Sequence, residues 1–382
     1  MNVLFITKGF PSDADPMTGN YEATQARAVA RQGHKVTVIA MKWRSILFLF
    51  SKREIAYRKE GNIDIFEKTG IVPVIPKVFH SYKLNRWMMK RAFSKFCEQY
   101  LQEHPNPDIV HIHSQFIAKY AIVIKEKYGF PTVLTEHWSG LNDGKLDKNL
   151  QSEVSVYKIA DDVIVVSKAL YNALLRNYGI KSHVIHNMVD NHFFLNKEST
   201  NKNGIFTFVS VGRLEPIKCF DALIKAYSKM SNHTQNTRLI IIGDGSESRR
   251  LHQLVKHLKI EDKVDLCGLK TPEEVSEVLC EADCFVLSSH RETFGIVLIE
   301  AMAKGLPVIC TRCGGPEDFV NESNGMLVEP DNPKELAKAM DYMVEHVYEY
   351  DNEAIRQFCA NTFSEEKIAK QIVRIYKKVL YK

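Results

Sequence analysis

The chain has 382 residues, of which 45% are hydrophobic and 25% are charged, and its formal net charge is +5. This composition is that of an ordinary soluble globular protein, which excludes a disordered chain, and so small a positive charge does not indicate a nucleic-acid-binding protein. The length exceeds what one hydrophobic core usually serves, so two domains are expected.

The first half of the chain alternates short apolar runs with longer amphipathic stretches, which is typical of a parallel sheet covered by helices. Met1 leads directly into the apolar run "VLFIT", so no secretory signal peptide is expected. A loop rich in Pro, Gly and Asp follows the first strand, and a helix predicted over 21–32 ends at Gly33. The predicted strands of this half are 2–7, 35–40, 108–113, 131–137, 162–167 and 182–187, with a helix after the strand over 162–167.

The positive charge is concentrated between Lys42 and Lys95, where thirteen Lys and Arg stand against four Asp and Glu, a local balance of +9. Within this segment, "MKWRSILFLFSKR" and "YKLNRWMMKRAFSKF" mix cations with large apolar side chains, as interfacial helices do. An ordinary helix with a solvated basic face is the alternative. The longest apolar run, "ILFLF" at 46–50, is too short to span a bilayer, which requires about eighteen residues. We therefore expect a cytoplasmic protein with peripheral contact to the inner membrane leaflet.

A polar run over 196–204, "NKESTNKNG", is predicted to be a linker, and the α/β alternation restarts after it. Two α/β domains are therefore predicted, over 1–197 and 205–360. A last helix begins near Phe363, and the segment 361–382 is expected to pack back on the first domain. Domains of this kind bind ligands at the carboxyl ends of their strands. The predicted strands of the second half are 206–212, 237–245, 263–268, 284–289 and 306–311.

Eight cysteines are spread along the chain, several of them inside apolar runs such as "DCFVL". They are expected to be buried and reduced, as in a cytoplasmic protein. Cys310 and Cys313 form a C-x-x-C pair, but no second pair stands at metal-binding spacing. Asp13 and Asp15 form a D-x-D that is flanked by prolines, which indicates a turn. No metal ion or other cofactor is expected.

The stretch "ETFGIVLIE", residues 292–300, sets a carboxylate at each end of a mostly apolar segment. It follows a predicted buried strand, and a helix is expected to begin at Gly295 and to end at Gly305. The start of such a helix offers unpaired N–H groups to an anion, and a carboxylate can accept two hydrogen bonds from a vicinal diol. Glu292 and Glu300 are therefore candidate sugar-binding residues. The alternative is a helix-terminal charge and a surface residue.

Two cations, Arg213 and Lys218, stand five residues apart in the loop that follows the strand over 206–212. Cations fixed beside a strand terminus suit a diphosphate, because charge-assisted hydrogen bonds to phosphate are strong and neutralise a departing group. A pair of solvated loop charges is the alternative. The run "GDGSES" at 243–248 begins like a dinucleotide fingerprint, but Ser248 stands in place of the third glycine, so NAD binding is not indicated.

Taken in chain order, these motifs resemble those of the retaining glycosyltransferases of family 4. The motifs are the glycine-bearing loop after the first strand, "GR(x4)K" at 212–218, "GDG" at 243–245, "E(x7)E" at 292–300 and "AMAKGLPVI…GGPEDFV…NGMLV" at 301–328. The resemblance covers nearly the whole chain and is densest from Ser210 to Val328. It implies the GT-B fold, an α/β architecture of two Rossmann-like, doubly wound parallel-sheet domains facing a central cleft.

The resemblance also implies roles for the matching residues. Arg213 and Lys218 would bind the nucleotide diphosphate. Glu292 would lie at the donor sugar and Glu300 would hold the ribose hydroxyls, while backbone groups between them would meet the phosphates. The residues expected to bind the donor are Gly19, Gly212, Arg213, Lys218, Gly243, Gly245, Leu269, Glu292, Thr293, Phe294, Gly295 and Glu300.

Two histidine-bearing stretches of the first domain complete the implied site. His137, in "VLTEHWSG", matches the family's cleft histidine and is expected to contact the donor sugar and the acceptor, with a structural histidine as the alternative. His111 and His113 end another predicted strand; only one is expected to face the cleft, and His113 is favoured on the acceptor side. In "MTGN", Gly19 is followed by Asn20 rather than by a second glycine. The expected catalytic residues are His137, Arg213, Lys218 and Glu292.

The implied activity is that of a hexosyltransferase, which moves a sugar with retention from a nucleotide-sugar to a glycan or polyprenyl-linked acceptor, as in capsule or O-antigen assembly. UDP is the expected nucleotide because it is common in the family. The leaving phosphate would take the acceptor proton, and the sequence has no nucleophile–base pair of the Ser-His-Asp kind. Metal-independent transfer is therefore expected. Two alternatives stay open: a nucleotide-sugar epimerase of the same fold, and a nucleotide-sugar-binding partner without activity.

Overall fold

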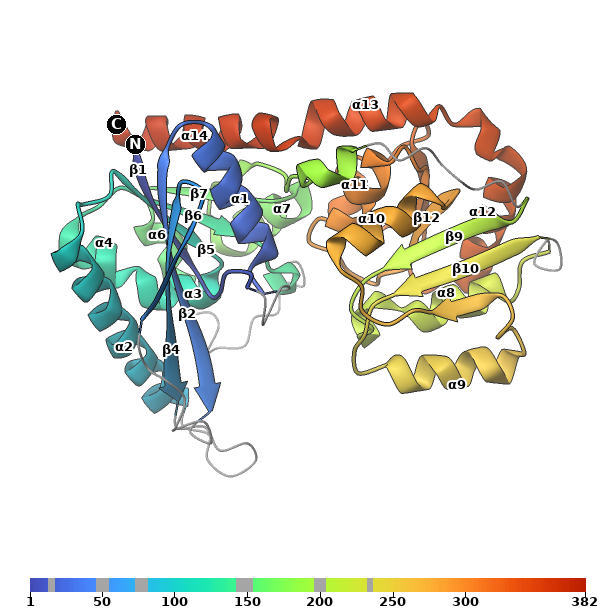
Figure 1. Cartoon of the computed structure of the whole chain (residues 1–382), viewed down its shortest axis with the longest axis horizontal. Coiled ribbons are helices and arrows are strands. Elements are labelled where there is room, and N and C mark those ends of the chain that lie inside the picture. The colour runs from blue at the N-terminus through green and yellow to red at the C-terminus, as the bar shows by residue number, and fades with distance from the viewer. Residues whose placement is uncertain (13–17, 46–54, 73–81, 142–153, 196–203, 232–235) are drawn as a thin grey trace. The chain divides into compact units, whose positions relative to one another are not determined.

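The computed structural model describes residues 1–12, 18–45, 55–72, 82–141, 154–195, 204–231 and 236–382. The chain divides into two compact units. Each unit is an α/β structure built on its own sheet, as Figure 1 shows, so the predicted class and the two-domain organisation are confirmed. The N-terminal unit holds Met1–Val166, Leu170–His186 and Glu365–Lys382, and the C-terminal unit holds Ser167–Ala169 and Asn187–Ser364.

The N-terminal unit contains an eight-stranded sheet in the order β3-β4-β2-β1-β5-β6-β7-β8. Neighbouring strands are parallel except at one edge, where β3 pairs antiparallel with β4. β5 and β6 are buried at every position, as expected for central strands with both faces covered. The strands are β1 (Asn2–Thr7), β2 (Lys35–Ser45), β3 (Ala56–Glu60), β4 (Ile63–Val72), β5 (Ile109–His113), β6 (Thr132–Glu136), β7 (Asp162–Val165) and β8 (His183–Val184).

The hairpin of β3 and β4 was not predicted from the sequence. β3 reads "AYRKE" and lies at the sheet edge, where a strand needs no apolar alternation. Gly61, with φ of +55°, lies in the turn between the two strands. β2 pairs with β4 as far as Ser45, so the interfacial helix predicted for "MKWRS" is wrong: these residues are drawn into the sheet by pairing with β4. The rest of that stretch, 46–54, lies outside the described residues.

Helices pack on the N-terminal sheet and bury apolar faces against it. α1 confirms the helix predicted over 21–32, and it packs against α14, which buries Ile368, Ile372 and Tyr376. The second basic stretch forms a helix, α2, as predicted. The helices of this unit are α1 (Asn20–Arg31), α2 (Tyr82–Glu103), α3 (Gln115–Ala121), α4 (Val123–Tyr128), η2 (Ser139–Leu141), α6 (Ser155–Ile159), α7 (Lys168–Tyr178) and α14 (Glu365–Leu380).

The C-terminal unit contains a six-stranded parallel sheet in the order β11-β10-β9-β12-β13-β14. Its first five strands in sequence confirm the five predicted ones, and β14, in the "NGMLV" motif, was not predicted. Short β-branched and aromatic runs such as "FTFVSV" explain why these segments form strands. The strands are β9 (Phe206–Val211), β10 (Thr237–Ile242), β11 (Val264–Leu266), β12 (Cys284–Leu287), β13 (Val308–Thr311) and β14 (Gly325–Val328).

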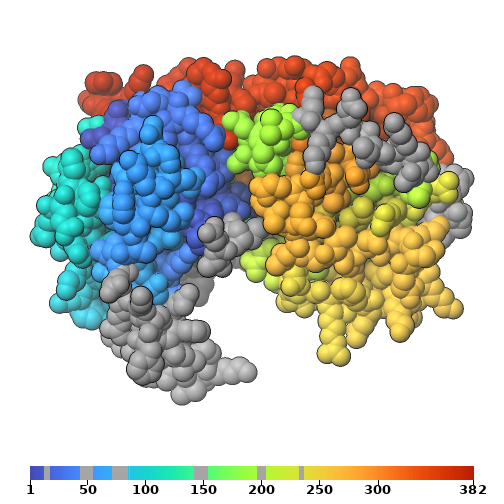
Figure 2. Space-filling model, in the orientation of Figure 1, coloured from blue at the N-terminus to red at the C-terminus, as the bar shows by residue number. Residues whose placement is uncertain are grey.

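Helices of the C-terminal unit begin with clear local signals. In α10 the Thr271 hydroxyl accepts from Glu274 N at 3.3 Å, and Glu274 Oε2 accepts from Thr271 N at 2.8 Å, which is a capping box. α9 buries Leu251 and Val255 and turns its charged face to the surface, where it is yellow in Figure 2. The helices are η3 (Asn191–Phe194), η4 (Pro216–Lys218), α8 (Phe220–Tyr227), α9 (Ser248–Leu258), α10 (Pro272–Cys280), α11 (Ile296–Ala303), η5 (Gly315–Asp318), α12 (Pro333–His346), η6 (Val347–Glu349) and α13 (Asn352–Phe363).

The boundaries of the units differ from the predicted ends at 197 and 360. Residues from Asn187 onward belong to the C-terminal unit, because Val189 N donates to Phe363 O at 2.9 Å and Lys304 Nζ donates to Leu195 O at 2.9 Å. Ser364, with φ of −61° and ψ of 150°, interrupts the helix between α13 and α14. The last segment therefore joins the N-terminal unit from Glu365 onward. The predicted linker lies outside the described residues apart from Gly204.

The eight cysteines are free thiols, as predicted from the sequence. Cys267 is exposed, because it follows the short strand β11 in a surface loop, and two others are half-buried. Among the helices of the described residues, none is long and apolar enough to cross a bilayer. The buried thiols are Cys97, Cys284, Cys310, Cys313 and Cys359.

Candidate active site

In the C-terminal unit, the predicted site residues follow the carboxyl ends of β9, β10 and β12. The loops after β9 and β10 stay paired beyond the strands: Gly212 N donates to Ile242 O, and Leu214 N donates to Asp244 O, both at 3.0 Å. Gly243 has φ of +141°, and a Cβ added to it would lie 1.9 Å from Gly212 O. A Cβ on Gly245 would lie 2.5 Å from Leu214 O. The "GDG" motif is therefore required for the close contact of the two loops.

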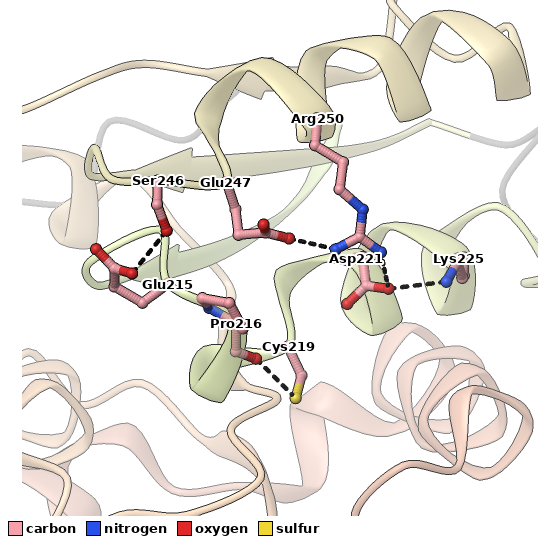
Figure 3. Close-up of polar contacts among 8 residues, drawn as sticks. All are labelled: Glu215, Pro216, Cys219, Asp221, Lys225, Ser246, Glu247 and Arg250. Atoms are coloured by element: carbon pink, nitrogen blue, oxygen red, sulfur yellow. Dashed lines mark hydrogen bonds and ion pairs between the residues drawn. The ribbon is translucent and has the colours of Figure 1, made fainter. Parts of the chain in front are cut away.

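Side-chain contacts tie the same loops to α8 and α9 (Figure 3). Glu215 accepts from Ser246 Oγ at 2.7 Å, and this hydrogen bond lowers the pKa of Glu215. Asp221 on α8 accepts from Lys225 Nζ at 2.8 Å and from Arg250 Nη2 at 3.3 Å. The loop that carries Arg213 and Lys218 is thus joined to the β10 loop at Glu215, and the helix that follows it, α8, is joined to α9. Sequence reasoning did not identify these contacts.

The two predicted cations are held very differently. The Arg213 side chain is 81% exposed, and the nearest ion pair joins its Nη2 to Glu215 Oε1 at 3.5 Å. The Lys218 side chain is 27% exposed and donates from Nζ to Glu292 Oε1. Only Lys218 is therefore a fixed cation, whereas Arg213 is a solvated loop charge that a ligand would have to order. The expectation of two fixed cations is corrected in this respect: the Arg213 side chain lies outside the packed part of the loop.

Glu292 is held at several points. Its Oε1 accepts from Lys218 Nζ and from Ser289 Oγ, the latter at 2.8 Å, and its side chain is 12% exposed. Its N–H donates to Cys313 O at 2.8 Å, in a bridge that joins the β12 loop to Gly314. Because Oε1 carries these contacts, Oε2 is the oxygen that remains for a hydroxyl of a bound ligand.

The helix predicted from "ETFGIVLIE" is present as α11. Gly295, with φ of +90°, is its N-cap, and Gly305, with φ of +83°, follows its C-terminus, which confirms both predicted ends. Phe294 is buried, with its ring centroid 5.0 Å from that of Phe319 and 5.7 Å from that of Phe363. The apolar residues of the motif thus anchor α11, and its first N–H groups lie at the loop that carries Glu292.

Glu300 lies on α11, half-buried, so it is not the surface residue of the alternative interpretation. Burial raises its pKa to about 7, while the nearby His192 lowers it and Asp190 raises it. His192 Nδ1 and Asp190 Oδ1 are 2.9 Å apart. Although burial opposes it, this hydrogen bond raises the pKa of His192. Sequence reasoning missed this pair, which comes from η3, a segment far from Glu300 in sequence.

Two further predicted donor-binding residues lie in loops of the same unit. Leu269 follows β11 and its side chain is 68% exposed, so it is accessible to a ligand. Thr293 is half-buried between Glu292 and Phe294. No side chain would fit at position 315 beside this turn, because a Cβ added to Gly315 would lie 2.3 Å from Phe294 Cα.

In the N-terminal unit, Gly19 is the N-cap of α1 with φ of +79°. A Cβ on Gly19 would lie 2.2 Å from Gly9 O, so the two glycines bring the ends of the loop after β1 together. The residues between them include Asp13 and Asp15 of the predicted turn and Met17 of "MTGN", which lie outside the described residues.

Three histidines cluster at the carboxyl ends of β5 and β6. His113 Nδ1 and His137 Nε2 are 3.3 Å apart, and the rings of His111 and His113 lie 4.3 Å apart. Burial lowers the pKa of His111 to about 3, that of His113 well below its usual range, and that of His137 to about 4, with Lys8 contributing to the last. All three are therefore neutral at pH 7 and act as hydrogen-bonding groups rather than as cations.

His111 and His113 lie on the same face of the sheet, and not on opposite faces as the expectation assumed. The two residues are two apart on β5, and alternate residues of a strand share one face, so their rings lie together. Their partners distinguish them. His111 contacts the Tyr376 hydroxyl at 2.6 Å and Thr135 Oγ1 at 2.7 Å, so it is a structural residue. His113 Nε2 is buried and has no hydrogen-bond partner among the described residues.

Glu136 was missed by sequence reasoning although it precedes His137. It is fully buried, its Oε1 accepts from the N–H groups of His137 and Trp138 at 2.8 Å, and its Oε2 accepts from Tyr157 Oη at 2.6 Å. These bonds fix the backbone that carries His137. A charged residue among buried strand residues was the only signal of this role in the sequence.

The part of the chain that the structure describes has no group of three or more His, Cys, Asp or Glu side chains that could hold a metal ion.

Comparison with protein families supports the motifs. Residues 191–358 match the family model of "Glycosyl transferases group 1", and residues 19–193 match that of "Glycosyltransferase Family 4". The two matches meet near the boundary between the units and together reach from residue 19 to residue 358.

Curated relatives include an N-acetyl-alpha-D-glucosaminyl L-malate synthase of Bacillus anthracis, 29% identical over 80% of this chain and 86% of that protein. TuaC of Bacillus subtilis, named as a teichuronic acid biosynthesis glycosyltransferase, is 26% identical over 89% of this chain and 88% of its own length.

Solved structures with the same fold include a sucrose-phosphate synthase from Thermosynechococcus elongatus, with a TM-score of 0.79 and 20% identity, covering 100% of this chain and 99% of that one. Anabaena Alr3699/HepE in complex with UDP and glucose gives a TM-score of 0.75 at 19% identity, covering 99% of this chain and 100% of that one. The implied GT-B fold is thereby confirmed.

Proposed function

The chain is a glycosyltransferase of the GT-B fold that uses a nucleotide-sugar donor, and we propose that it transfers a hexose with retention from a UDP-sugar to a glycan or polyprenyl-linked acceptor of a cell-surface polysaccharide. The observation that carries the proposal is the contact of Lys218 with Glu292 beside the N-terminus of α11. A cation, a carboxylate and free helix N–H groups are what a sugar diphosphate requires at one place.

The residues of the C-terminal unit have distinct tasks in this reaction. The bond between the anomeric carbon and the diphosphate oxygen breaks, and negative charge develops on that oxygen. Lys218 and the N–H groups of α11 stabilise this charge, and Arg213 becomes ordered on the diphosphate. Glu292 accepts from a hydroxyl of the donor sugar through Oε2.

The acceptor hydroxyl attacks the anomeric carbon on the face that the diphosphate leaves, and its proton passes to the departing phosphate oxygen. The bond to the acceptor oxygen thus replaces the bond to phosphate on the same face. On this account no protein nucleophile is needed. The neutral His137 would hydrogen-bond sugar hydroxyls, and His113 would orient His137 from the acceptor side.

Donor affinity is expected to weaken as the pH falls through about 7, the pKa of Glu300. The ionised carboxylate accepts from both ribose hydroxyls, so binding favours the deprotonated form, and well below this pKa the Kd rises about tenfold for each pH unit. Titration of UDP binding by calorimetry between pH 5.5 and 8.5 measures this. The terminal phosphate of UDP titrates in the same range, so the Glu300→Gln variant, which keeps that contribution, is the reference. Equal pH profiles for the two proteins contradict the role of Glu300.

For folding, the sign of the Glu300 effect is opposite. Burial disfavours the charged form, so the folded-state pKa lies above the ordinary value of 4.5. Below pH 4.5 the carboxyl group is therefore protonated in the folded state, and its burial does not lower the free energy of unfolding. Its cost to stability grows between 4.5 and about 7 and is constant above that range. A loss of donor affinity at pH 6 is accordingly not explained by this group's effect on folding.

Transfer is expected to proceed without a metal ion. We expect the initial rate in about 5 mM EDTA to differ by less than about twofold from the initial rate in buffer without EDTA. The reason is that Lys218 and α11 supply the positive charge that Mg²⁺ supplies elsewhere. Abolition of transfer by EDTA, with recovery on addition of Mg²⁺ or Mn²⁺, is the contrary outcome. Anomeric NMR of the product, with a donor of known configuration, tests retention in the same reaction.

The donor is identified by a thermal-shift screen with UDP, GDP, ADP, CMP and their common sugar conjugates. A ligand at a hundredfold excess over its Kd stabilises the folded protein by about 2.7 kcal/mol. UDP is expected to raise the Tm of the wild type and not that of Lys218→Met. A shift with another nucleotide corrects the donor base. Turnover of donor to an isomer without acceptor favours the epimerase, and binding without turnover favours the inactive partner.

The acceptor class also has a second candidate. The Bacillus anthracis relative is named for a small acid, L-malate, whereas TuaC is named for a cell-wall polymer. TuaC matches a larger share of this chain, which favours the glycan. The rate of UDP release is measured once with L-malate and once with lipid-linked glycan that has been extracted from membranes. The faster release identifies the acceptor class.

Peripheral membrane contact is proposed through α2. Its Trp87 side chain is 58% exposed, and the Arg91 guanidinium lies 5.6 Å from the centre of that ring. A cation beside an exposed indole suits the surface of an anionic bilayer. Liposomes with about 30% anionic lipid imitate an anionic leaflet. At low salt, we expect the double variant Trp87→Ser with Arg91→Glu to lower the fraction of protein that sediments with these liposomes at least about fivefold. Arg374→Glu, on the exposed face of α14, is the charge-matched control. Wild-type protein that stays in the supernatant excludes this contact.

A further inference from the structure

A cavity of about 290 Å³ lies in the N-terminal unit at the amino ends of β1, β2 and β4. Gly19, His113 and His137 instead lie at or after the carboxyl ends of β1, β5 and β6. A strand rises about 3.3 Å per residue, so the six residues of β1 separate the two ends of the sheet by about 20 Å. The cavity is therefore distinct from the histidine cluster, and no role proposed above uses it.

Aromatic side chains form one wall of the cavity. The Tyr100 and His104 rings stack 4.4 Å apart with 8° between their planes, and Phe66 meets both nearly edge-on, at 5.2 and 5.0 Å. These rings pack mainly on one another. Tyr57 differs, because its side chain is 57% exposed while its ring lies 5.0 Å from that of Phe66. Tyr57 thus offers an open aromatic face that is backed by a packed cluster.

Polar groups of both charges line the same cavity. Asp64 is half-buried, and its Oδ1 accepts from the Tyr57 hydroxyl at 2.9 Å, which leaves Oδ2 for a ligand. Lys35 is exposed at the start of β2 and supplies an ammonium group. His104 Nδ1 contacts Tyr100 O at 2.9 Å, so its Nε2 is directed elsewhere. The cavity therefore combines an acceptor, a donor and an apolar surface.

This combination excludes several classes of ligand. A phosphate or other anion is repelled by Asp64, and an ammonium ligand is repelled by Lys35. An aromatic cage for an ammonium group is not formed, because the faces of Tyr100 and His104 cover each other. A neutral pyranose fits. Its C–H face would pack on Tyr57, a hydroxyl would donate to Asp64 Oδ2, and Lys35 would donate to another hydroxyl or to the ring oxygen. The volume lies just below that of sites for drug-sized ligands, which limits the occupant to about one sugar ring.

We propose that this cavity is a second carbohydrate site, which binds one neutral pyranose unit of the glycan acceptor at a distance from the reacting end. The inference rests on the proposed function in that the acceptor is taken to be a glycan. A polymer held at this cavity would remain attached between transfers, because two weak sites on one chain raise its effective concentration at each.

The test is saturation-transfer NMR of the full-length protein with methyl α-glycosides of glucose, galactose, mannose and N-acetylglucosamine. We expect at least one glycoside to bind the wild type. Its Kd should rise at least tenfold in Tyr57→Ala and in Asp64→Asn. Lys35→Met, on an exposed side chain outside the β3–β4 hairpin, provides a third variant in case the first two disturb folding. Tyr128→Ala, an exposed tyrosine stacked on Phe130 at 5.7 Å, is the matched control and should bind like the wild type.

The outcomes separate this cavity from the transfer site. Glycoside binding that survives His137→Ala and is lost in the cavity variants supports the proposal. Binding lost in His137→Ala and retained in Tyr57→Ala and Lys35→Met overturns it, as does the absence of binding by all four glycosides. The nucleotide thermal shift and donor turnover are measured on the same samples. If these fail, the proposed function fails, whereas normal turnover with an inert cavity overturns this inference alone.

Discussion

Replacing Lys218 by methionine is expected to lower kcat/KM for sugar transfer by about 10² to 10³, the usual effect of removing one fixed donor from a developing negative charge. Lys218 is the cation that the fold holds in place, through Glu292 and through the hydrogen bond of its carbonyl with Ser288 Oγ at 3.0 Å. Methionine keeps the length and apolar stem of the side chain and removes the charge. Initial rates of donor consumption with and without acceptor give the effect.

Two variants show whether the loss is due to the charge at this position. Lys225→Met removes a lysine from α8 that pairs with Asp221 at 2.8 Å, and it should change the rate less than about twofold, as is usual for an exposed ion pair. Lys218→Arg keeps a cation with a different shape and should recover part of the activity. If Lys218→Met retains more than about a third of wild-type activity while it is folded, Lys218 does not stabilise the leaving diphosphate.

Replacing Gly243 by alanine is expected to destabilise the C-terminal unit by more than about 4 kcal/mol, which is rare for one substitution. The new methyl group would lie 1.9 Å from Gly212 O, and φ of +141° is a conformation that residues with a side chain rarely adopt. The loops after β9 and β10 would have to separate, and with them the support of Lys218. Thermal unfolding followed by circular dichroism, with the yield of soluble protein, measures the loss.

Gly268→Ala is the matched control. Gly268 also has a positive φ, +69°, and its carbonyl accepts from Gly243 N at 2.8 Å, but a Cβ on Gly268 would meet no atom within 4 Å. Only the conformational cost of about 1–2 kcal/mol is expected there. Similar Tm values for the two variants would mean that the close contact with Gly212 is not the reason why the "GDG" motif requires glycine at position 243.

The helix signals in the sequence were reliable because they are local. Gly295 and Gly305 bound α11 where glycine was expected to bound it, since a positive φ at a helix end has a low cost only for glycine. Buried strands were found for the same reason: a short apolar, β-branched run between turn residues has few alternatives. The edge strand β3 was missed because an edge position places no demand on its apolar pattern.

Local patterns in the sequence did not predict the contacts between residues that are far apart along the chain. Nothing in the run "GRLEPIK" shows that Lys218 would reach Glu292, 74 residues away, while Arg213 in the same motif would stay in solvent. The hydroxyl group that contacts His111 belongs to Tyr376 on α14, which lies 265 residues further along the chain. The pKa of Glu300 likewise depends on η3, which folds against α11.

The sequence by itself determined the α/β class, the order of the motifs and the positions where only glycine fits, because periodicity and backbone freedom are properties of neighbouring residues. Tertiary structure decided which of the two cations is fixed, which histidine of the β5–β6 cluster keeps an unpartnered nitrogen, and where the cavity at the amino ends of β1, β2 and β4 lies. Those features arise where strands and helices distant in sequence meet, and the burial and pairing that shift a pKa or hold a side chain exist only after they have packed.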